Sequence, residues 1–171
     1  MRTIYLIGMM GSGKTVVAQL LAQQLGRPMV DLDALIEARE KKKITAIFAE
    51  KGEAYFRAVE AAVLKEISLQ KGIIVATGGG IVLNPQNIEC MDATGITIYL
   101  KAPTDLLYER LKDATDRPLL QGKDPQGALE RIYTTRASLY EKAHLTVNTQ
   151  NKNPYDVAQE IIHMIEENKL V

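Results

Sequence analysis

Apolar residues in this chain fall into two kinds of pattern, which predict strands and helices in alternation. Short runs that are apolar almost throughout predict strands buried on both faces. These runs cover residues 3–7, 28–33, 72–77, 97–100 and 145–149. Stretches with apolar residues every three or four positions predict amphipathic helices between the strands. The helical stretches cover residues 16–25, 34–39, 41–51, 52–70, 104–113, 130–140 and 155–167.

Strands that alternate with helices are typical of a parallel sheet covered by helices on both faces. We therefore expect an α/β fold with a five-stranded parallel sheet. The length of 171 residues predicts a single domain, residues 1–171, with a sizeable core. Ligands of such folds bind at the carboxyl ends of the strands, so polar residues that follow strands are the first candidates for chemistry.

The segment after the first strand fits the phosphate-binding loop (P-loop) pattern G-x-x-x-x-G-K-[ST]. It reads Gly8-Met9-Met10-Gly11-Ser12-Gly13-Lys14-Thr15 and lies between a predicted strand and a predicted helix. Backbone N–H groups and the helix N-terminus attract phosphate at such a loop. Lys14 would reach the β- and γ-phosphates, and the Thr15 hydroxyl would bind Mg²⁺. The alternative is a glycine turn with an incidental lysine, which the agreement of the motif with both flanks makes the weaker interpretation.

Two carboxylates, Asp31 and Asp33, end the second predicted strand. Because they are two residues apart, they would share one face of a strand. Asp33 also precedes a helical stretch, where it would serve as the N-cap. At the carboxyl edge of a P-loop sheet, both lie within reach of Mg²⁺ and of a second substrate, which favours a functional role.

An arginine, Arg57, lies near the start of the helix predicted for residues 52–70. A cation at that end is unfavourable with respect to the helix dipole, so its placement indicates an anionic partner. That partner is either a bound ligand or one of the neighbouring carboxylates, Glu53 and Glu60. The residues alone leave both interpretations open.

Three consecutive glycines, Gly78, Gly79 and Gly80, follow the third strand. Glycine costs chain entropy, and a tight turn needs only one or two of them. The third glycine therefore indicates that a ligand approaches the backbone closely.

A polar segment at about residues 112–124 contains Pro118 and Gly122 and lacks core-forming periodicity. We interpret it as a mobile lid with Arg117 at its tip. The alternative is a plain surface loop.

Three further arginines flank this segment. Arg110 precedes it, on a helix that would face the nucleotide. Arg131 and Arg136 follow it on one helix, five residues apart, so they do not share a face. At most one of these two is expected to point into the ligand crevice.

Composition narrows the range of partners and compartments. Lys plus Arg and Asp plus Glu both number 21, which argues against nucleic acid or an anionic membrane as a partner. No apolar run approaches the roughly 20 residues that a membrane span needs. Cys90 is the only cysteine, which excludes an intrachain disulfide and suits a reducing cytosol. We expect a cytoplasmic monomer whose partners are small molecules.

Taken together, these motifs resemble the shikimate kinase family, and the resemblance covers residues 3 to about 165. The P-loop alone is unspecific, whereas the G-E-x-x-F-R-x-x-E, G-G-G and R-P-L-L blocks in this order are highly specific. The matching blocks are Gly8–Thr15, Asp31-x-Asp33, Gly52-Glu53-x-x-Phe56-Arg57-x-x-Glu60, Thr77-Gly78-Gly79-Gly80, Arg117-Pro118-Leu119-Leu120 and Arg136-x-x-x-Tyr140.

The resemblance implies an activity and a more detailed fold. The activity is ATP-dependent phosphorylation of the 3-hydroxyl of shikimate, on the pathway to chorismate and the aromatic amino acids, with ATP and Mg²⁺ as cofactors. The fold is a P-loop three-layer α/β/α sandwich similar to nucleoside monophosphate kinases, with strand order 2-3-1-4-5.

The resemblance also implies roles for single residues. The acceptor region spans about residues 33–60, where Asp33 binds the acceptor hydroxyls. Arg57, Arg136 and the backbone of Gly78–Gly80 hold the carboxylate and ring. Lys14, Asp33 and Arg117 are the implied catalytic residues, and Thr15 and Asp31 the implied Mg²⁺ residues. The implied ATP-binding residues are Gly11, Ser12, Gly13, Lys14, Thr15, Val16, Arg110, Arg117, Lys152 and Asn153.

Three other functions compete with this interpretation. A gluconate kinase of similar build would not call for both Arg57 and Arg136, because its acceptor differs in charge. A regulatory GTPase reads guanine with Asn-Lys-x-Asp, and residues 151–154 lack the aspartate. A non-catalytic relative of a kinase should have lost a phosphate or acceptor residue, and none is missing.

Overall fold

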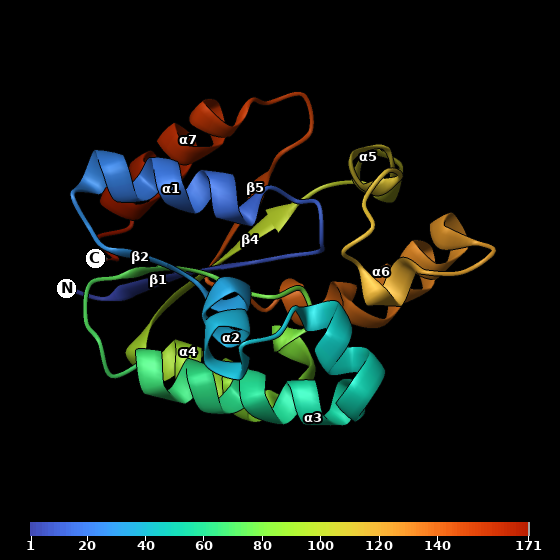
Figure 1. Ribbon diagram of the computed structural model, residues 1–171. Coiled ribbons are helices and arrows are strands. Elements are labelled where there is room, and N and C mark those ends of the chain that lie inside the picture. The colour runs from blue at the N-terminus through green and yellow to red at the C-terminus, as the bar shows by residue number, and fades with distance from the viewer. Residues whose placement is uncertain (171) are drawn as a thin grey trace.

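The computed structural model describes residues 1–170 and contains a five-stranded sheet with the order β2-β3-β1-β4-β5 (Figure 1). All neighbouring strands are parallel. This order and the expected α/β class are confirmed. The strands are β1 (Thr3–Ile7), β2 (Met29–Asp31), β3 (Ile74–Ala76), β4 (Gly95–Lys101) and β5 (Leu145–Asn148).

Helices cover both faces of the sheet (Figure 1). They are α1 (Lys14–Leu25), α2 (Leu32–Glu40), α3 (Ile44–Ile67), α4 (Pro85–Thr94), α5 (Thr104–Leu111), α6 (Pro125–Tyr140) and α7 (Pro154–Glu167). Figure 1 shows α1 and α7 on one face, and α2, α3 and α4 on the other. Short 3₁₀ segments lie at Ile81–Leu83 and Pro118–Leu120. None of the helices within residues 1–170 combines the length and apolar character that a bilayer crossing requires.

The side chains of the central strand β1 pack into the cores on both faces of the sheet. Ile4 and Leu6 pack into the core cluster formed with α1 and α7. Tyr5 and Ile7 pack into the second cluster, formed with α3 and α4 on the opposite face. Both faces of the strand are therefore buried, and its one small polar side chain, Thr3, donates a hydrogen bond to the carbonyl of Gln70.

The strand register brings the functional segments to one edge of the sheet. Asp31, the last residue of β2, lies opposite Ala76, and Ala76 lies opposite Leu6 of β1. The P-loop, the end of β2 and the triple-glycine turn after β3 therefore start side by side. This is the carboxyl edge at which α/β folds bind ligands.

The end of β2 differs from the prediction. The strand stops at Asp31, and Asp33 lies in the first turn of α2. Asp31 is the N-cap, because its Oδ1 accepts a hydrogen bond of 3.1 Å from the N–H of Ala34. The predictions that the two carboxylates share a strand face and that Asp33 caps the helix were therefore wrong. The strand pairs with β3 over three residues only, and the buried Leu32 turns the chain into the helix.

The helices predicted for residues 41–51 and 52–70 form one run, α3, with a break at Gly52. Gly52 has φ 81° and ψ 171°, a conformation that a residue with a side chain adopts only under strain. The change of direction brings Phe48 and Phe56 together, with ring centroids 5.0 Å apart. The helix begins at Ile44 and ends at Ile67, so both outer boundaries were placed three residues too far out.

Candidate active site

The P-loop encloses the lysine of the motif. Lys14 begins α1, and its Nζ donates hydrogen bonds of 2.9 Å to the carbonyls of Gly8 and Met9. Burial lowers the pKa of Lys14 to about 8, against the opposing attraction of Asp33. A buried ammonium group held among backbone carbonyls is ready to exchange these partners for phosphate oxygens.

Two side chains with oxygen atoms that could bind a metal ion, Thr15 and Asp31, meet beside the P-loop. The Thr15 hydroxyl donates a 2.7 Å hydrogen bond to Oδ2 of Asp31. Because Oδ1 of Asp31 caps α2, the carboxylate is fixed in position. The end of β2 and the start of α1 thus place a hydroxyl and a carboxylate next to each other, which are ligand types that Mg²⁺ prefers.

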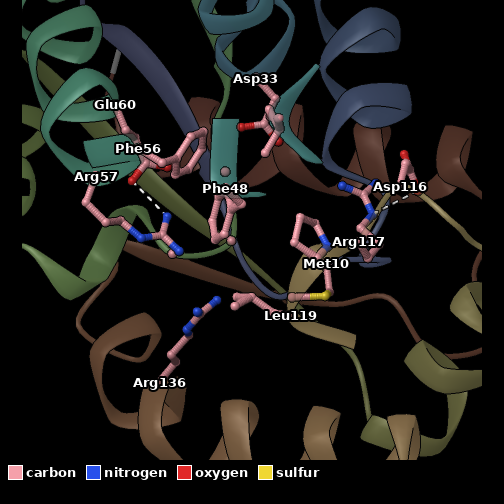
Figure 2. Close-up of a pocket in the computed structure, with 15 residues that line it drawn as sticks. Met10, Asp33, Phe48, Phe56, Arg57, Glu60, Asp116, Arg117, Leu119 and Arg136 are labelled. Carbon is pink, nitrogen blue, oxygen red and sulfur yellow. Dashed lines mark hydrogen bonds and ion pairs between the residues drawn. The ribbon is translucent and has the colours of Figure 1, made fainter. Parts of the chain in front are cut away.

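Asp33 points into the site from the first turn of α2 (Figure 2). Its Oδ1 is buried and has no hydrogen-bond partner within residues 1–170. Burial, together with the nearby charge of Asp31, raises the pKa of Asp33, while Lys14, Arg117 and Arg57 oppose the rise. An unpartnered carboxylate oxygen surrounded by cations suits a hydroxyl group as its missing partner.

Arg57 is paired with both neighbouring carboxylates. Its guanidinium contacts Glu53 at 3.1 Å and Glu60 at 3.0 Å. The alternative of an ion pair within the helix is therefore present in the structure. The guanidinium nevertheless lines the same cavity as Asp33, so the ion pairs hold it beside a candidate ligand.

The triple-glycine turn lies directly against two arginines. The Arg57 guanidinium occupies the space that a Cβ atom on Gly80 would need. A Cβ atom on Gly79 would lie 3.6 Å from Nη1 of Arg136. Figure 2 shows Arg57 and Arg136 reaching the cavity from α3 and α6. The structure thus places both arginines beside the glycine turn, in one cavity.

Of the two arginines on α6, one points inward and the other outward, as their spacing predicts. Arg136 is 4% exposed, and within residues 1–170 its guanidinium belongs to no ion pair. Arg131 is exposed, and its Nη1 lies 3.5 Å from Asp124. A nearly buried guanidinium without a counter-ion indicates an anionic ligand.

The polar segment predicted as a lid borders the same cavity. Its residues Asp116, Arg117, Pro118 and Leu119 line the pocket. Figure 2 labels Asp116, Arg117 and Leu119 there. Nε of Arg117 is buried without a hydrogen-bond partner among the described residues and lies 3.7 Å from Asp116. Arg117 thus belongs to the site and is more than a surface residue.

Two cavities adjoin at the P-loop. The first, which we call the acceptor cavity, is lined by Asp33 and Glu60, by Arg57 and Arg136, by the three glycines and by the lid residues. The phosphate cavity contains the P-loop and Asp31. Four residues line both cavities: Met10, Asp33, Gly79 and Arg117. The two cavities therefore adjoin at these residues.

A third cavity continues from the phosphate cavity on the α7 side. Gly11, Gly13 and Val16 line both cavities, and Ser12 lines the third. Arg110 lines this cavity and donates to the carbonyl of Gly11 at 3.0 Å. Lys152 also lines it, although its Nζ pairs with Glu160 at 2.5 Å. Asn153 does not line it, because its side chain caps α7 by accepting from the N–H of Asp156.

Sequence reasoning missed the buried carboxylate of Glu60 in the acceptor cavity. Glu60 was considered only as an ion-pair partner, yet its side chain is 1% exposed and its Oε1 has no partner within residues 1–170. Burial raises the pKa of Glu60 to about 6, opposed by Arg57. Its position in the sequence could have revealed its burial, because Glu60 shares the core face of α3 with Phe56 and Leu64. The apolar wall of Ile44, Phe48 and Leu119 was missed as well.

The fold and the three adjoining cavities define a P-loop phosphotransferase that acts on a small anionic molecule. The shikimate kinase family model matches residues 10–166. A shikimate kinase of Persephonella marina is 40% identical over 165 residues, covering 96% of this chain and 99% of the relative. A shikimate kinase of Synechococcus sp. strain JA-3-3Ab is 45% identical over 161 residues, covering 93% and 85%.

A solved structure agrees with these sequence matches. The shikimate kinase from Acinetobacter baumannii in complex with shikimate superposes with a TM-score of 0.97 at 39% identity, covering 100% of this chain and 96% of that one. The chain therefore belongs to the shikimate kinase family. Its activity is the ATP-dependent phosphorylation of shikimate to shikimate 3-phosphate, on the pathway to chorismate and the aromatic amino acids. A gluconate kinase, a regulatory GTPase and a non-catalytic relative are excluded.

Proposed function

We propose that the acceptor cavity binds shikimate by its carboxylate and directs one hydroxyl at ATP. Arg57, Arg136 and the backbone of Gly78–Gly80 hold the carboxylate and ring, and Asp33 accepts from the hydroxyls. The observation that carries this proposal is the convergence of Arg57 and Arg136 on the glycine turn. Two guanidinium groups on one carboxylate orient it as well as attract it.

We propose that ATP extends through the phosphate cavity into the cavity beside α7. Gly11, Ser12, Gly13, Lys14 and Thr15 take the phosphates, in keeping with their place at the N-terminus of α1. On the nucleoside side, Val16, Arg110 and Lys152 line the cavity. Asn153 also remains part of this proposal, through the backbone segment that leads into α7.

Thr15 and Asp31 are the proposed Mg²⁺ residues. Their 2.7 Å hydrogen bond brings together two hard oxygen donors beside the phosphate cavity. Mg²⁺ in nucleotide sites takes one or two protein ligands and completes its shell with water and phosphate oxygens. No cluster of three or more acidic, histidine or cysteine ligands occurs within residues 1–170, which fits such a sparse protein contribution. The ion would neutralise charge on the β- and γ-phosphates.

In the proposed transfer, the oriented hydroxyl oxygen attacks the γ-phosphorus, and ADP leaves from the opposite side. Asp33 orients the hydroxyl and accepts its proton. Lys14 and Arg117 stabilise negative charge on the transferring group. Because the transition state is loose, positioning of the substrates contributes more than the strength of the base. Asp33 and Arg117 line both cavities, so they are placed to position both substrates.

The whole chain is proposed to act as one kinase domain, residues 1–171. The acceptor region spans about residues 33–60, and residues 112–124 form the lid. We propose a monomer in the cytoplasm that binds neither nucleic acid nor membrane. The formal net charge of zero and the single cysteine support this part of the proposal.

Matched arginine variants test the acceptor site. Arg136→Ala should raise the KM for shikimate about 10- to 150-fold, which corresponds to a loss of about 1.5–3 kcal/mol in charge-assisted hydrogen bonding. Arg57→Ala should do the same, and Arg131→Ala on the outer face of α6 should leave KM unchanged. A coupled ADP assay measures all three. An unchanged shikimate KM in Arg57→Ala and Arg136→Ala would contradict the proposed pocket.

A further inference from the structure

Tyr140 ends α6 one helical turn after Arg136, and it is completely buried. Residues four apart on a helix share a face, so Tyr140 lies on the same side of α6 as the inward arginine. The mechanism described above gives this tyrosine no role, although its motif accompanies the acceptor arginine in the sequence. The contacts of Tyr140 point to a role in positioning the glycine turn.

The hydroxyl of Tyr140 donates a hydrogen bond to the carbonyl oxygen of Gly79. Within residues 1–170, no other group donates to this carbonyl. Sδ of Met9 lies 3.6 Å from the same hydroxyl, but a hydroxyl has a single proton to give. The carbonyl is the stronger acceptor, so the proton is committed to the middle glycine of the turn.

This bond also fixes the direction of the next amide. In a trans peptide the C=O and N–H groups point in opposite directions, and none of the peptide bonds in the described chain is cis. With the Gly79 carbonyl held by Tyr140, the N–H of Gly80 must point away from the tyrosine. That N–H donates no hydrogen bond within residues 1–170. A backbone donor at a buried turn needs an acceptor, and Gly80 lines the acceptor cavity.

The same tyrosine contacts the P-loop. Met9, whose sulfur lies beside the hydroxyl, uses its carbonyl to accept from Nζ of Lys14 at 2.9 Å. A Cβ atom on Gly79 would lie 3.3 Å from the N atom of Met10, so the glycine turn packs on the P-loop. Tyr140 therefore touches the loop that holds phosphate and the turn that faces the acceptor.

We propose that Tyr140 is a positioning residue for phosphoryl transfer. Its hydroxyl orients the Gly79–Gly80 peptide so that the Gly80 N–H donates to the acceptor carboxylate, at a fixed distance from the P-loop. The inference rests on the proposed binding of shikimate at the glycine turn. It adds a residue that contacts no substrate and acts through the backbone.

Tyr99 offers a matched control. Its ring stacks on that of Tyr140, with centroids 5.1 Å apart and an interplanar angle of 17°. Its own hydroxyl is buried and has no hydrogen-bond partner within residues 1–170. Removing that hydroxyl leaves the stacked rings in place and breaks no contact with the glycine turn.

The experiment compares Tyr140→Phe with Tyr99→Phe in the full-length enzyme. Tyr140→Phe should raise the KM for shikimate about 2- to 10-fold and lower kcat, while the KM for ATP stays within about 2-fold. Tyr99→Phe should match the parent in all three constants. In ¹H–¹⁵N spectra, shikimate should move the Gly80 amide proton downfield in the parent and in Tyr99→Phe, and much less in Tyr140→Phe.

Two results would overturn the proposal. One is a Tyr140→Phe enzyme with the shikimate KM and Gly80 amide shift of Tyr99→Phe. The other is an equal rise in both KM values with a lower melting temperature, which indicates general loosening. The arginine variants separate this outcome from a failure of the proposed function. If Arg57→Ala and Arg136→Ala raise the shikimate KM and Tyr140→Phe does not, only the role of Tyr140 is wrong.

Discussion

The Arg57 guanidinium fills the space in which a side chain on Gly80 would lie. Gly80 has φ −90°, which any residue adopts, so backbone conformation does not require a glycine here. The close approach of the Arg57 guanidinium is what requires a glycine at this position. Glu53 and Glu60 hold Arg57 in this place from its own helix. The third glycine is therefore explained by an arginine of the protein, and the sequence had attributed it to a ligand.

Gly80→Ala should displace Arg57 without disturbing the fold. The methyl group meets the far end of a flexible side chain, so the guanidinium can swing out. We expect the shikimate KM to rise about tenfold or more, with little change in ATP KM. The melting temperature should fall somewhat, because the buried Glu60 loses its ion-pair partner. Adding Gly80→Ala to Arg57→Ala should cause no further loss, because both changes remove the same contact. Additive effects on KM in this double-mutant cycle would contradict the explanation.

Lys14 of the P-loop and Arg117 of the proposed lid line the same cavity, where we propose that they stabilise charge on the transferring group. Replacing either with Ala should lower kcat by about 10²-fold or more, because a cation that stabilises charge in the transition state is lost. Saturating ATP and shikimate in a coupled assay separates this effect from weakened binding. Arg39→Ala is the control, since this exposed arginine lies outside the lid and pairs with Glu66 at 2.7 Å. A near-normal kcat in both Lys14→Ala and Arg117→Ala would rule out the charge-stabilising roles.

Asp31 caps α2, and in our proposal it also serves Mg²⁺, so one substitution can separate the two roles. Asn also caps helices well, so Asp31→Asn should keep α2 in place and leave the melting temperature nearly unchanged. The loss of negative charge should raise the Mg²⁺ concentration for half-maximal activity about tenfold. Chelation of Mg²⁺ should abolish turnover in both proteins, and a Mg²⁺ titration of kcat measures the difference. Identical titration curves would show that Asp31 does not serve the metal.

The sheet could be predicted because its strands are buried on both faces. Such strands leave continuous apolar runs in the sequence, and β1 and β4 lie close to the predicted residues. The P-loop could be predicted because its motif fixes both residues and flanking elements. These features are local in sequence, so periodicity and spacing report them directly.

The failures arise where a contact distant in sequence decides the outcome. The length of β2 depends on how far β3 extends beside it, which the segment around Asp33 does not encode. Glu60 is buried because Arg57 and the glycine turn surround it. The sequence also did not predict that Asn153 caps α7, because a short polar segment does not by itself show where a helix begins.

Glu60 makes the stability of the protein depend on pH. Burial raises its pKa in the folded state to about 6, from 4.5 for the ordinary side chain. Below pH 4.5 the carboxyl is protonated in both folded and unfolded chains, and it costs no stability. As pH rises from 4.5 through 6, the unfolded chain releases its proton more readily than the folded one. The unfolding free energy therefore falls across this window, by about 2 kcal/mol in total.

The variant Glu60→Gln isolates this contribution, because glutamine still accepts from Arg57 but does not ionise. Subtracting the unfolding free energy of the variant from that of the parent should give a curve that falls by about 2 kcal/mol between pH 4 and pH 7.5. Urea denaturation at each pH supplies the values. Glu53→Gln, which changes the exposed carboxylate partner of Arg57 in the same way, is the control. Parallel curves for parent and Glu60→Gln would mean that burial does not shift the Glu60 carboxyl.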